Sequence, residues 1–289
     1  MKLDMERVDH MLVGMLMIMG LGTLLGFTLP PNPDLNGRLY PYVSASMGYI
    51  YFLCWSLFYY PQAFQNYQRK DAEGLSIDFC LLDWFGCGCY ALQTFYFYTS
   101  PNIQRLYNER HDGISNVVEL NDVAFGLHSL IMCSVWIFQI WYYNGSIKPS
   151  KPTFNLLFAV TVVFATYGIC LVMAPHHPKW FPAAFLAKLN GLDFLYAVTN
   201  FSVVTILISW LPQVLLNCKL KSTEGFTIWG VILDLLGGLL SVLQLIFDAY
   251  NQSDPTAIQG DFAKLFIGLI SIFYMVSLFY WIIQLLARY

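Results

Sequence analysis

Residues 211 to 225 read Leu211-Pro-Gln-Val-Leu-Leu-Asn-Cys-Lys-Leu-Lys-Ser-Thr-Glu-Gly225, and they link two apolar stretches of the chain. The polar residues of this segment also occur earlier, at one fixed offset of 151 positions. Nine identities share that offset without a gap: Pro61 and Pro212, Gln62 and Gln213, Asn66 and Asn217, Lys70 and Lys221, Glu73 and Glu224, Gly74 and Gly225, Asp83 and Asp234, Gly86 and Gly237, Gln93 and Gln244. The chain therefore contains a duplicated unit.

The composition is that of a membrane protein with several spans, because 57% of the residues are hydrophobic and only 11% are charged. The lipid bilayer is therefore an expected partner. A net charge of −3 and the lack of a basic tract argue against nucleic acid as a partner. Seven scattered cysteines indicate neither a disulfide framework nor a zinc site, so no metal is expected. Cys87-Gly-Cys89 is interpreted as small residues packed between helices and not as a redox pair.

Seven apolar segments are each close to the roughly 20 residues that a helix needs to cross a bilayer. They are residues 44–66, 76–98, 121–143, 154–174, 192–216, 227–249 and 263–286. Residues 11–29 form a further apolar run, which we expect to be an extra N-terminal helix and not a cleaved signal peptide, because prolines follow it in place of a small-residue cleavage site. Within this run, the spacing of Gly22 and Gly26 predicts close contact with a neighbouring helix.

The duplication predicts two three-helix bundles joined by one connector helix, which gives both bundles the same orientation. The expected divisions are 1–43 for the N-terminal apolar segment and a lumenal loop, 44–143 for the first bundle, 144–190 for the connector helix and its loops, and 191–289 for the second bundle. An excess of lysine and arginine in alternate loops predicts which side faces the cytosol. Parallel repeats of this kind are typical of transporters, with the substrate between the repeats.

Each copy carries a proline followed by a glutamine near the end of its first helix. Pro61 and Pro212 remove a backbone hydrogen bond and clash with the carbonyl four residues earlier, so we expect kinks that serve as hinges. Gln62 and Gln213 offer amides that either bridge backbone groups or meet a ligand.

Asp83 and Asp234 lie about 12 Å inside their predicted helices, at 1.5 Å per residue. A central aspartate costs about 2.5 to 3.5 kcal/mol on insertion scales, so intramembrane acids usually face a cavity or a partner. We expect both to exchange protons; the alternative is a hydrogen bond to a neighbouring helix. Asp122 is a further proton acceptor or, equally, a helix N-terminal acid stabilised by the macrodipole. His128 is more consistent with a packed neutral side chain than with a proton relay.

The segments Tyr59-Tyr-Pro-Gln-Ala-Phe-Gln-Asn66, Asn121-Asp-Val-Ala-Phe-Gly-Leu-His128 and Leu233-Asp-Leu-Leu-Gly-Gly238 resemble the PQ-loop family, and within it the cystinosin branch. The resemblance implies a seven-helix transporter with a SWEET-like fold, without a cofactor, that moves cystine and protons out of lysosomes or vacuoles. It also implies that Asp234 and Asp122 are the protonatable pair. By the same resemblance, Trp55, Gln62, Asn217 and Asp83 lie in or near the substrate site.

One departure from the family keeps other substrates open: Ser209 stands where the family has a lysine. With no basic residue in the middle of any predicted span, the carboxylates of cystine would depend on neutral donors such as Gln213 and the Trp55 indole. Two intramembrane acids, Asp83 and Asp234, without a basic residue favour a cationic substrate. An exporter of lysine or arginine is therefore an alternative. A non-transporting receptor or nutrient-sensing scaffold is the alternative of another class. Enzymatic activity is not expected, since the sequence lacks a Ser/His pair and a His-Glu-x-x-His motif.

Overall fold

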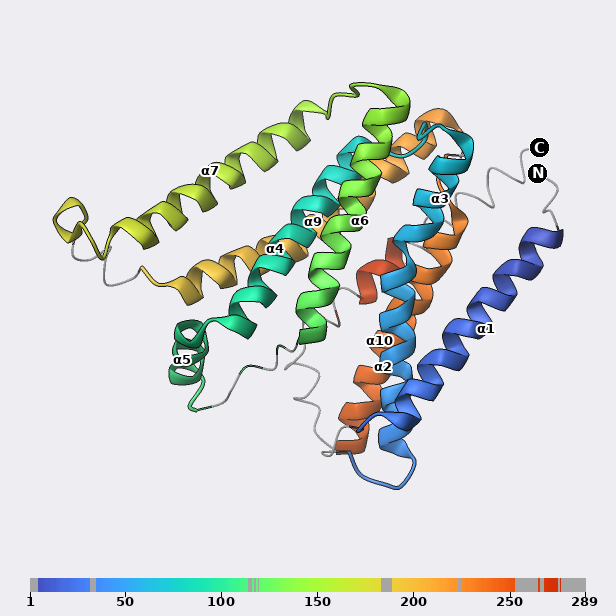
Figure 1. Ribbon diagram of the computed structural model, residues 1–289, viewed down its shortest axis with the longest axis horizontal. Helices are drawn as coiled ribbons and strands as arrows, with labels where there is room; N and C mark the ends of the chain where they lie inside the picture. Colours follow the sequence, from blue (N-terminus) through green and yellow to red (C-terminus); the bar gives the residue numbers. More distant parts are fainter. Residues whose placement is uncertain are drawn as a thin grey trace. The chain divides into compact units, whose positions relative to one another are not determined.

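A computed structural model describes residues 5–31, 35–113, 120–182, 189–222, 225–252 and 268–274, with the single residues 116, 118, 265 and 276. The regular elements of the described chain are helices (Figure 1). Their bounds are α1 Met5–Thr28, α2 Tyr40–Leu57, α3 Tyr59–Arg69, α4 Ile77–Thr99, α5 Pro101–Arg110, α6 Leu120–Asn144, α7 Lys151–Met173, the 3₁₀ turn η1 Pro178–Trp180, α9 Gly191–Leu220 and α10 Ile228–Gln252.

The helices confirm the all-α, multi-span prediction. Among the described residues, four helical segments are long and apolar enough to cross a bilayer: 122–144, 151–173, 191–220 and 228–252. The predicted segments at 11–29 and 76–98 correspond to α1 and α4. Of the predicted final helix, residues 268–274 are helical, whereas residues 277–286 lie outside the described part of the chain.

The first predicted span is not one continuous helix. The helical hydrogen-bond pattern is interrupted at the single residue Phe58, between α2 and α3, although the backbone of Phe58 keeps helical dihedral angles. Pro61 explains this break, since its ring clashes with the carbonyl four residues earlier, at Leu57. In the second copy α9 continues through Pro212, so the interruption of the hydrogen-bond pattern occurs only in the first copy.

The chain forms two compact units. The first contains residues 1–65 and 226–289 and is built on α2, which packs against α1 on one side and α10 on another (Figure 1). Gly22 and Gly26 of α1 allow this approach: a Cβ atom on Gly22 would lie 2.5 Å from Ile50 Cγ1, and one on Gly26 would collide with Ser46. The predicted contact of these two glycines with a neighbouring helix is therefore confirmed.

The second unit, residues 66–225, is built on α4, which packs against α6 and α9. At one level of this unit, Phe79 of α4 lies between two indoles, with ring centroids 5.9 Å from Trp136 and 5.0 Å from Trp210. Phe79 and Trp136 are almost completely buried, and aromatic clusters of this kind contribute beyond their buried area. The connector α7 contacts α9 and α4 but leaves most of its surface exposed.

Each unit takes helices from both sequence copies. In the first unit α2 of the first copy packs on α10 of the second, and in the second unit α4 of the first copy packs on α9 of the second. The division of the chain into bundles at residues 44–143 and 191–289 stays a prediction.

Candidate functional site

The two Pro-Gln glutamines make equivalent hydrogen bonds. In the first unit the Oε1 atom of Gln62 accepts from the backbone N–H of Thr227 at 2.9 Å. In the second unit the Oε1 atom of Gln213 accepts from the backbone N–H of Ser76 at 2.8 Å. Thr227 and Ser76 differ by the same offset of 151 and precede α10 and α4 directly. Each glutamine therefore ties its own helix to the start of the second helix of the other copy.

Both glutamines are buried, with Gln62 1% and Gln213 0% exposed. The Nε2 group of Gln213 donates to the carbonyl of Gly74 at 2.8 Å and to Oδ1 of Asn217 at 3.0 Å. Of the two sequence interpretations, bridging of backbone groups is thus present in the structure, and a direct contact of these amides with substrate stays a prediction. Asn217 differs from them, because its buried Nδ2 group has no hydrogen-bond partner in the described chain.

The loops that follow the two glutamines meet at a pair of glycines. A Cβ atom on Gly74 would lie 2.6 Å from the Cα atom of Gly225, and one on Gly225 would overlap the carbonyl oxygen of Glu73. Gly74 also has a φ of +94°, which favours glycine. Only residues without side chains allow these two backbones to approach so closely.

Asp83 lies in the middle of α4 and is only 9% exposed. Its Oδ2 atom accepts a hydrogen bond of 3.0 Å from the Cys133 thiol of α6, which is fully buried. The Sγ atom of Cys133 is in turn 3.8 Å from that of Cys87, one turn after Asp83. The carboxylate therefore contacts a neighbouring helix, as the alternative interpretation of an intramembrane acid expects.

Asp234 occupies the equivalent position on α10 and is 8% exposed. Its Oδ1 atom accepts a hydrogen bond of 3.2 Å from Ser271. Both aspartates thus accept a bond from the third helical segment of their own copy. Asp83 belongs to the second unit and Asp234 to the first, and their exposure to one shared chamber stays a prediction.

Trp55 packs on the glycine that follows Asp234 on α10. Its ring lies at an edge-on angle to Tyr51, with centroids 5.2 Å apart, and a Cβ atom on Gly237 would lie 2.6 Å from the indole Nε1. The absence of a side chain at Gly237 therefore gives the indole its place beside α10. Asp122 lies in the first turn of α6, where an acid is stabilised by the helix dipole.

Comparisons with known proteins connect these features to one family. The PQ loop repeat model matches residues 43–103 and 194–254, which contain both copies. A cystinosin homolog of Arabidopsis thaliana is 30% identical over 79% of this chain and 80% of its own length. The chain belongs to the cystinosin family. The cystinosin of Drosophila melanogaster is 34% identical over 83% of this chain, and the cystine transporter of Saccharomyces cerevisiae is 27% identical over 71%.

The chain spans little more than half of the length of several cystinosin relatives. It covers 57% of the Drosophila protein, 54% of the Caenorhabditis elegans homolog and 64% of the bovine protein. Both PQ loop repeats nevertheless fall within the shared part. The comparisons therefore confirm the resemblance to the PQ-loop family and its cystinosin branch. They also confirm that the protein is a multi-pass membrane protein.

Ser209, at the position of the family lysine, is fully buried in this member of the cystinosin family. Its hydroxyl donates to the carbonyl of Ile206 at 3.0 Å, within its own helix. Along the described spans, lysine and arginine are confined to helix ends. The described part of α9 therefore has a neutral hydroxyl at the position of the family lysine.

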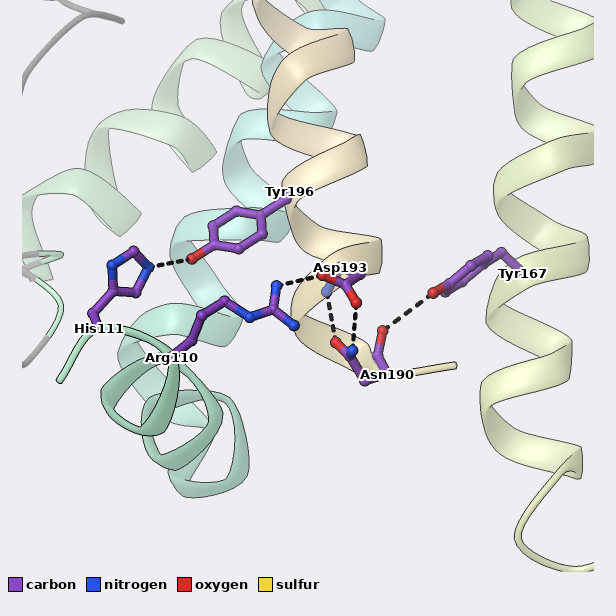
Figure 2. Close-up of polar contacts among 6 residues, drawn as sticks. All are labelled: Arg110, His111, Tyr167, Asn190, Asp193 and Tyr196. Atoms are coloured by element: carbon purple, nitrogen blue, oxygen red, sulfur yellow. Dashed lines mark hydrogen bonds and ion pairs between the residues drawn. The ribbon is translucent and has the colours of Figure 1, made fainter. Parts of the chain in front are cut away.

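A polar cluster at the start of α9 was not predicted from the sequence. Figure 2 shows Arg110 of α5 directed at Asp193, and His111 at the hydroxyl of Tyr196, 2.9 Å from the ring nitrogen Nε2. Asn190 caps α9 by accepting from the backbone N–H of Asp193 at 2.8 Å. The hydrogen bond that Arg110 donates to the carboxylate of Asp193 raises the pKa of Arg110. No short motif indicates the cluster, because α5 and α9 are about 80 residues apart.

Proposed function

We propose that the protein exports cystine, with protons, from the acidic lumen of a lysosome or vacuole to the cytosol. The observation that carries the proposal is the pair of buried carboxylates, Asp83 and Asp234, at equivalent positions of two helices. Such groups are costly in a bilayer and usually serve a pathway for ions or substrate. The names of the relatives, cystinosin and cystine transporter, support the choice of substrate.

In this proposal Asp234 and Asp122 carry the coupled proton. Asp122 lies at the start of α6, on the side predicted to be lumenal, and receives the proton first. Asp234 lies deeper, and its bond to Ser271 is compatible with either protonation state because a hydroxyl can donate or accept. A role of Asp83 as a third proton-coupling acid stays a prediction.

Substrate recognition is assigned to the neutral donors of both copies. Cystine has two ammonium and two carboxylate groups, and a dry site must satisfy all four. The unpartnered Nδ2 group of Asn217 and the indole N–H of Trp55 are suited to the carboxylates. Asp83 and Asp234 are suited to the ammonium groups. Pro61 and Pro212 act as the hinges of alternating access.

The test uses the full chain in vesicles with an imposed inward pH gradient. Labelled cystine should accumulate with the gradient and lose this dependence in Asp234→Asn. Asp248→Asn is the matched control, because Asp248 lies on the same helix near its end and accepts from Ser44 at 2.9 Å. Proton-driven uptake that is equal in Asp234→Asn and the wild type would contradict the assignment.

A lysine or arginine exporter is the second candidate, and the buried Ser209 favours it. A lysine there would offer a counter-charge for carboxylates, whereas serine leaves acids without a base. A competition panel of amino acids against proton influx distinguishes the candidates: cystine competes in the first, lysine and arginine in the second. If no amino acid moves protons, a non-transporting receptor or scaffold is the better description.

A further inference from the structure

We propose that Asp83, Cys87 and Cys133 form a binding site for a thiophilic divalent cation, with Zn²⁺ as the best match. One carboxylate oxygen and two thiol sulfurs, from α4 and α6, all lie within 4.8 Å of one another. Two thiolates and one carboxylate are a donor set that zinc accepts in proteins. No metal was expected from the sequence, because the seven cysteines are scattered along it.

The distances agree with a tetrahedral ion. Two Zn–S bonds of about 2.3 Å at a tetrahedral angle place the sulfurs about 3.8 Å apart, and the Sγ atoms of Cys87 and Cys133 are 3.8 Å apart. The 3.0 Å between Cys133 Sγ and Asp83 Oδ2 is shorter than the roughly 3.5 Å edge between a sulfur and an oxygen ligand. Binding of the ion therefore requires these two atoms to separate by about 0.5 Å.

The surroundings favour a bound ion over three separate polar groups. Asp83 and Cys87 are one helical turn apart on the same face of α4, and both are more than nine-tenths buried, as is Cys133. Ser129, one turn before Cys133 on α6, is also buried, and its hydroxyl has no hydrogen-bond partner in the described chain. The fourth position of a tetrahedral ion is left for a water molecule. Binding of Zn²⁺ would release the two thiol protons and leave the site with the single negative charge of the ionised carboxylate, now shared with the bound ion.

A bound cation would join α4 to α6 and occupy the Asp83 carboxylate. If the protein has the proposed function, Asp83 contributes to substrate recognition. Zn²⁺ bound to Asp83 should then inhibit transport, because the carboxylate is no longer available to the substrate. This consequence depends on the proposed function, whereas binding of the ion does not. The two are therefore measured separately.

The binding test uses the full chain, purified in detergent with its thiols reduced, and Co²⁺ as the spectroscopic probe. We expect one Co²⁺ per chain with a thiolate-to-cobalt charge-transfer band, and its displacement by Zn²⁺. Cys133→Ser and Cys87→Ser should each weaken binding by at least the roughly 10- to 100-fold that loss of an outer-shell partner costs. Cys80→Ser and Cys89→Ser are the controls, since both thiols are buried on α4 outside the cluster.

Asp83→Asn is a third variant, for use where a cysteine variant does not remain monodisperse in size-exclusion chromatography. The proposal is overturned by the absence of the charge-transfer band, by unchanged affinity in the cluster variants, or by equal loss in the control variants. Tight Zn²⁺ binding without an effect on transport would retain the site and contradict only the inhibitory consequence.

Discussion

Gly74 and Gly225 lie back to back although 151 residues separate them, with 2.6 Å between a Cβ atom built on Gly74 and the Cα atom of Gly225. The two are equivalent positions of the two sequence copies. Both lie in the second unit, and their contact brings the loops that follow the two Pro-Gln motifs together there.

Gly225→Ala should destabilise the protein, because the added methyl group overlaps the backbone of Glu73 and one of the loops must move. Overpacking of this kind costs about 1 to 3 kcal/mol. Gly168→Ala on α7 is the control, since nothing lies within 4 Å of the added Cβ. There, alanine should stabilise by about 0.5 to 1 kcal/mol, as in any helix interior. Thermal unfolding in detergent measures both, and shifts of the same sign would contradict the packing argument.

Gln213→Leu should remove the acceptor for the Ser76 N–H and the donor for the Gly74 carbonyl. A buried polar group left without its partner costs about 1 to 3 kcal/mol. Gln62→Leu should have a similar effect through Thr227, because the two bonds are equivalent. Unfolding midpoints of both variants should therefore fall together, and Gln93→Leu, at a half-buried position of α4, should change the midpoint less. A large effect of only one glutamine would show that the duplicated bonds are not equivalent in energy.

Asp71, in the loop after α3, makes the stability depend on pH at acidic values. The hydrogen bond from the Asn144 amide lowers the pKa of Asp71 below its ordinary value, and the bond from the Glu73 N–H acts in the same direction. A lowered pKa means that the ionised carboxylate contributes stability above its unfolded pKa of about 3.9. That contribution is lost as the pH falls through the folded pKa.

Asp71→Asn should therefore be less stable than the wild type at neutral pH, by up to about 1 kcal/mol, because the site is partly exposed. The difference should shrink below about pH 4. Unfolding curves measured between pH 3 and 7 check the prediction. A difference that is constant over this range would show that the charge of Asp71 makes no contribution.

Lys221 closes α9 with a left-handed backbone, at a φ of 51°. Lys70 has the same conformation after α3, at 55°. Left-handed positions favour glycine, so Lys221→Gly should stabilise the protein by about 0.4 to 1 kcal/mol relative to the strained lysine. Lys219→Gly is the matched control: it lies in the last helical turn, where glycine should destabilise by a similar amount. Opposite changes in melting temperature are expected.

Much of the fold could be predicted from the sequence. The hydrophobic segments indicate the helices, and the fixed offset of 151 positions indicates which helices are equivalent. The predicted spans agree with α4, α6, α7, α9 and α10 to within a few residues. The partners of Gln62 and Gln213 were not predictable from side-chain motifs, since both glutamines accept from backbone N–H groups. Cys133 could not be connected to Asp83 by spacing, because only the packing of α6 on α4 brings them together.

The exchange of helices between the copies has a consequence for the origin of the chain. A single copy would supply α2 without the α10 that packs on it, and α4 without α9. A chain of half this length would complete both units only by pairing with a second copy of itself. In the present chain α7 connects the two copies, so two fragments separated within the loop before α7 and produced together should reassemble.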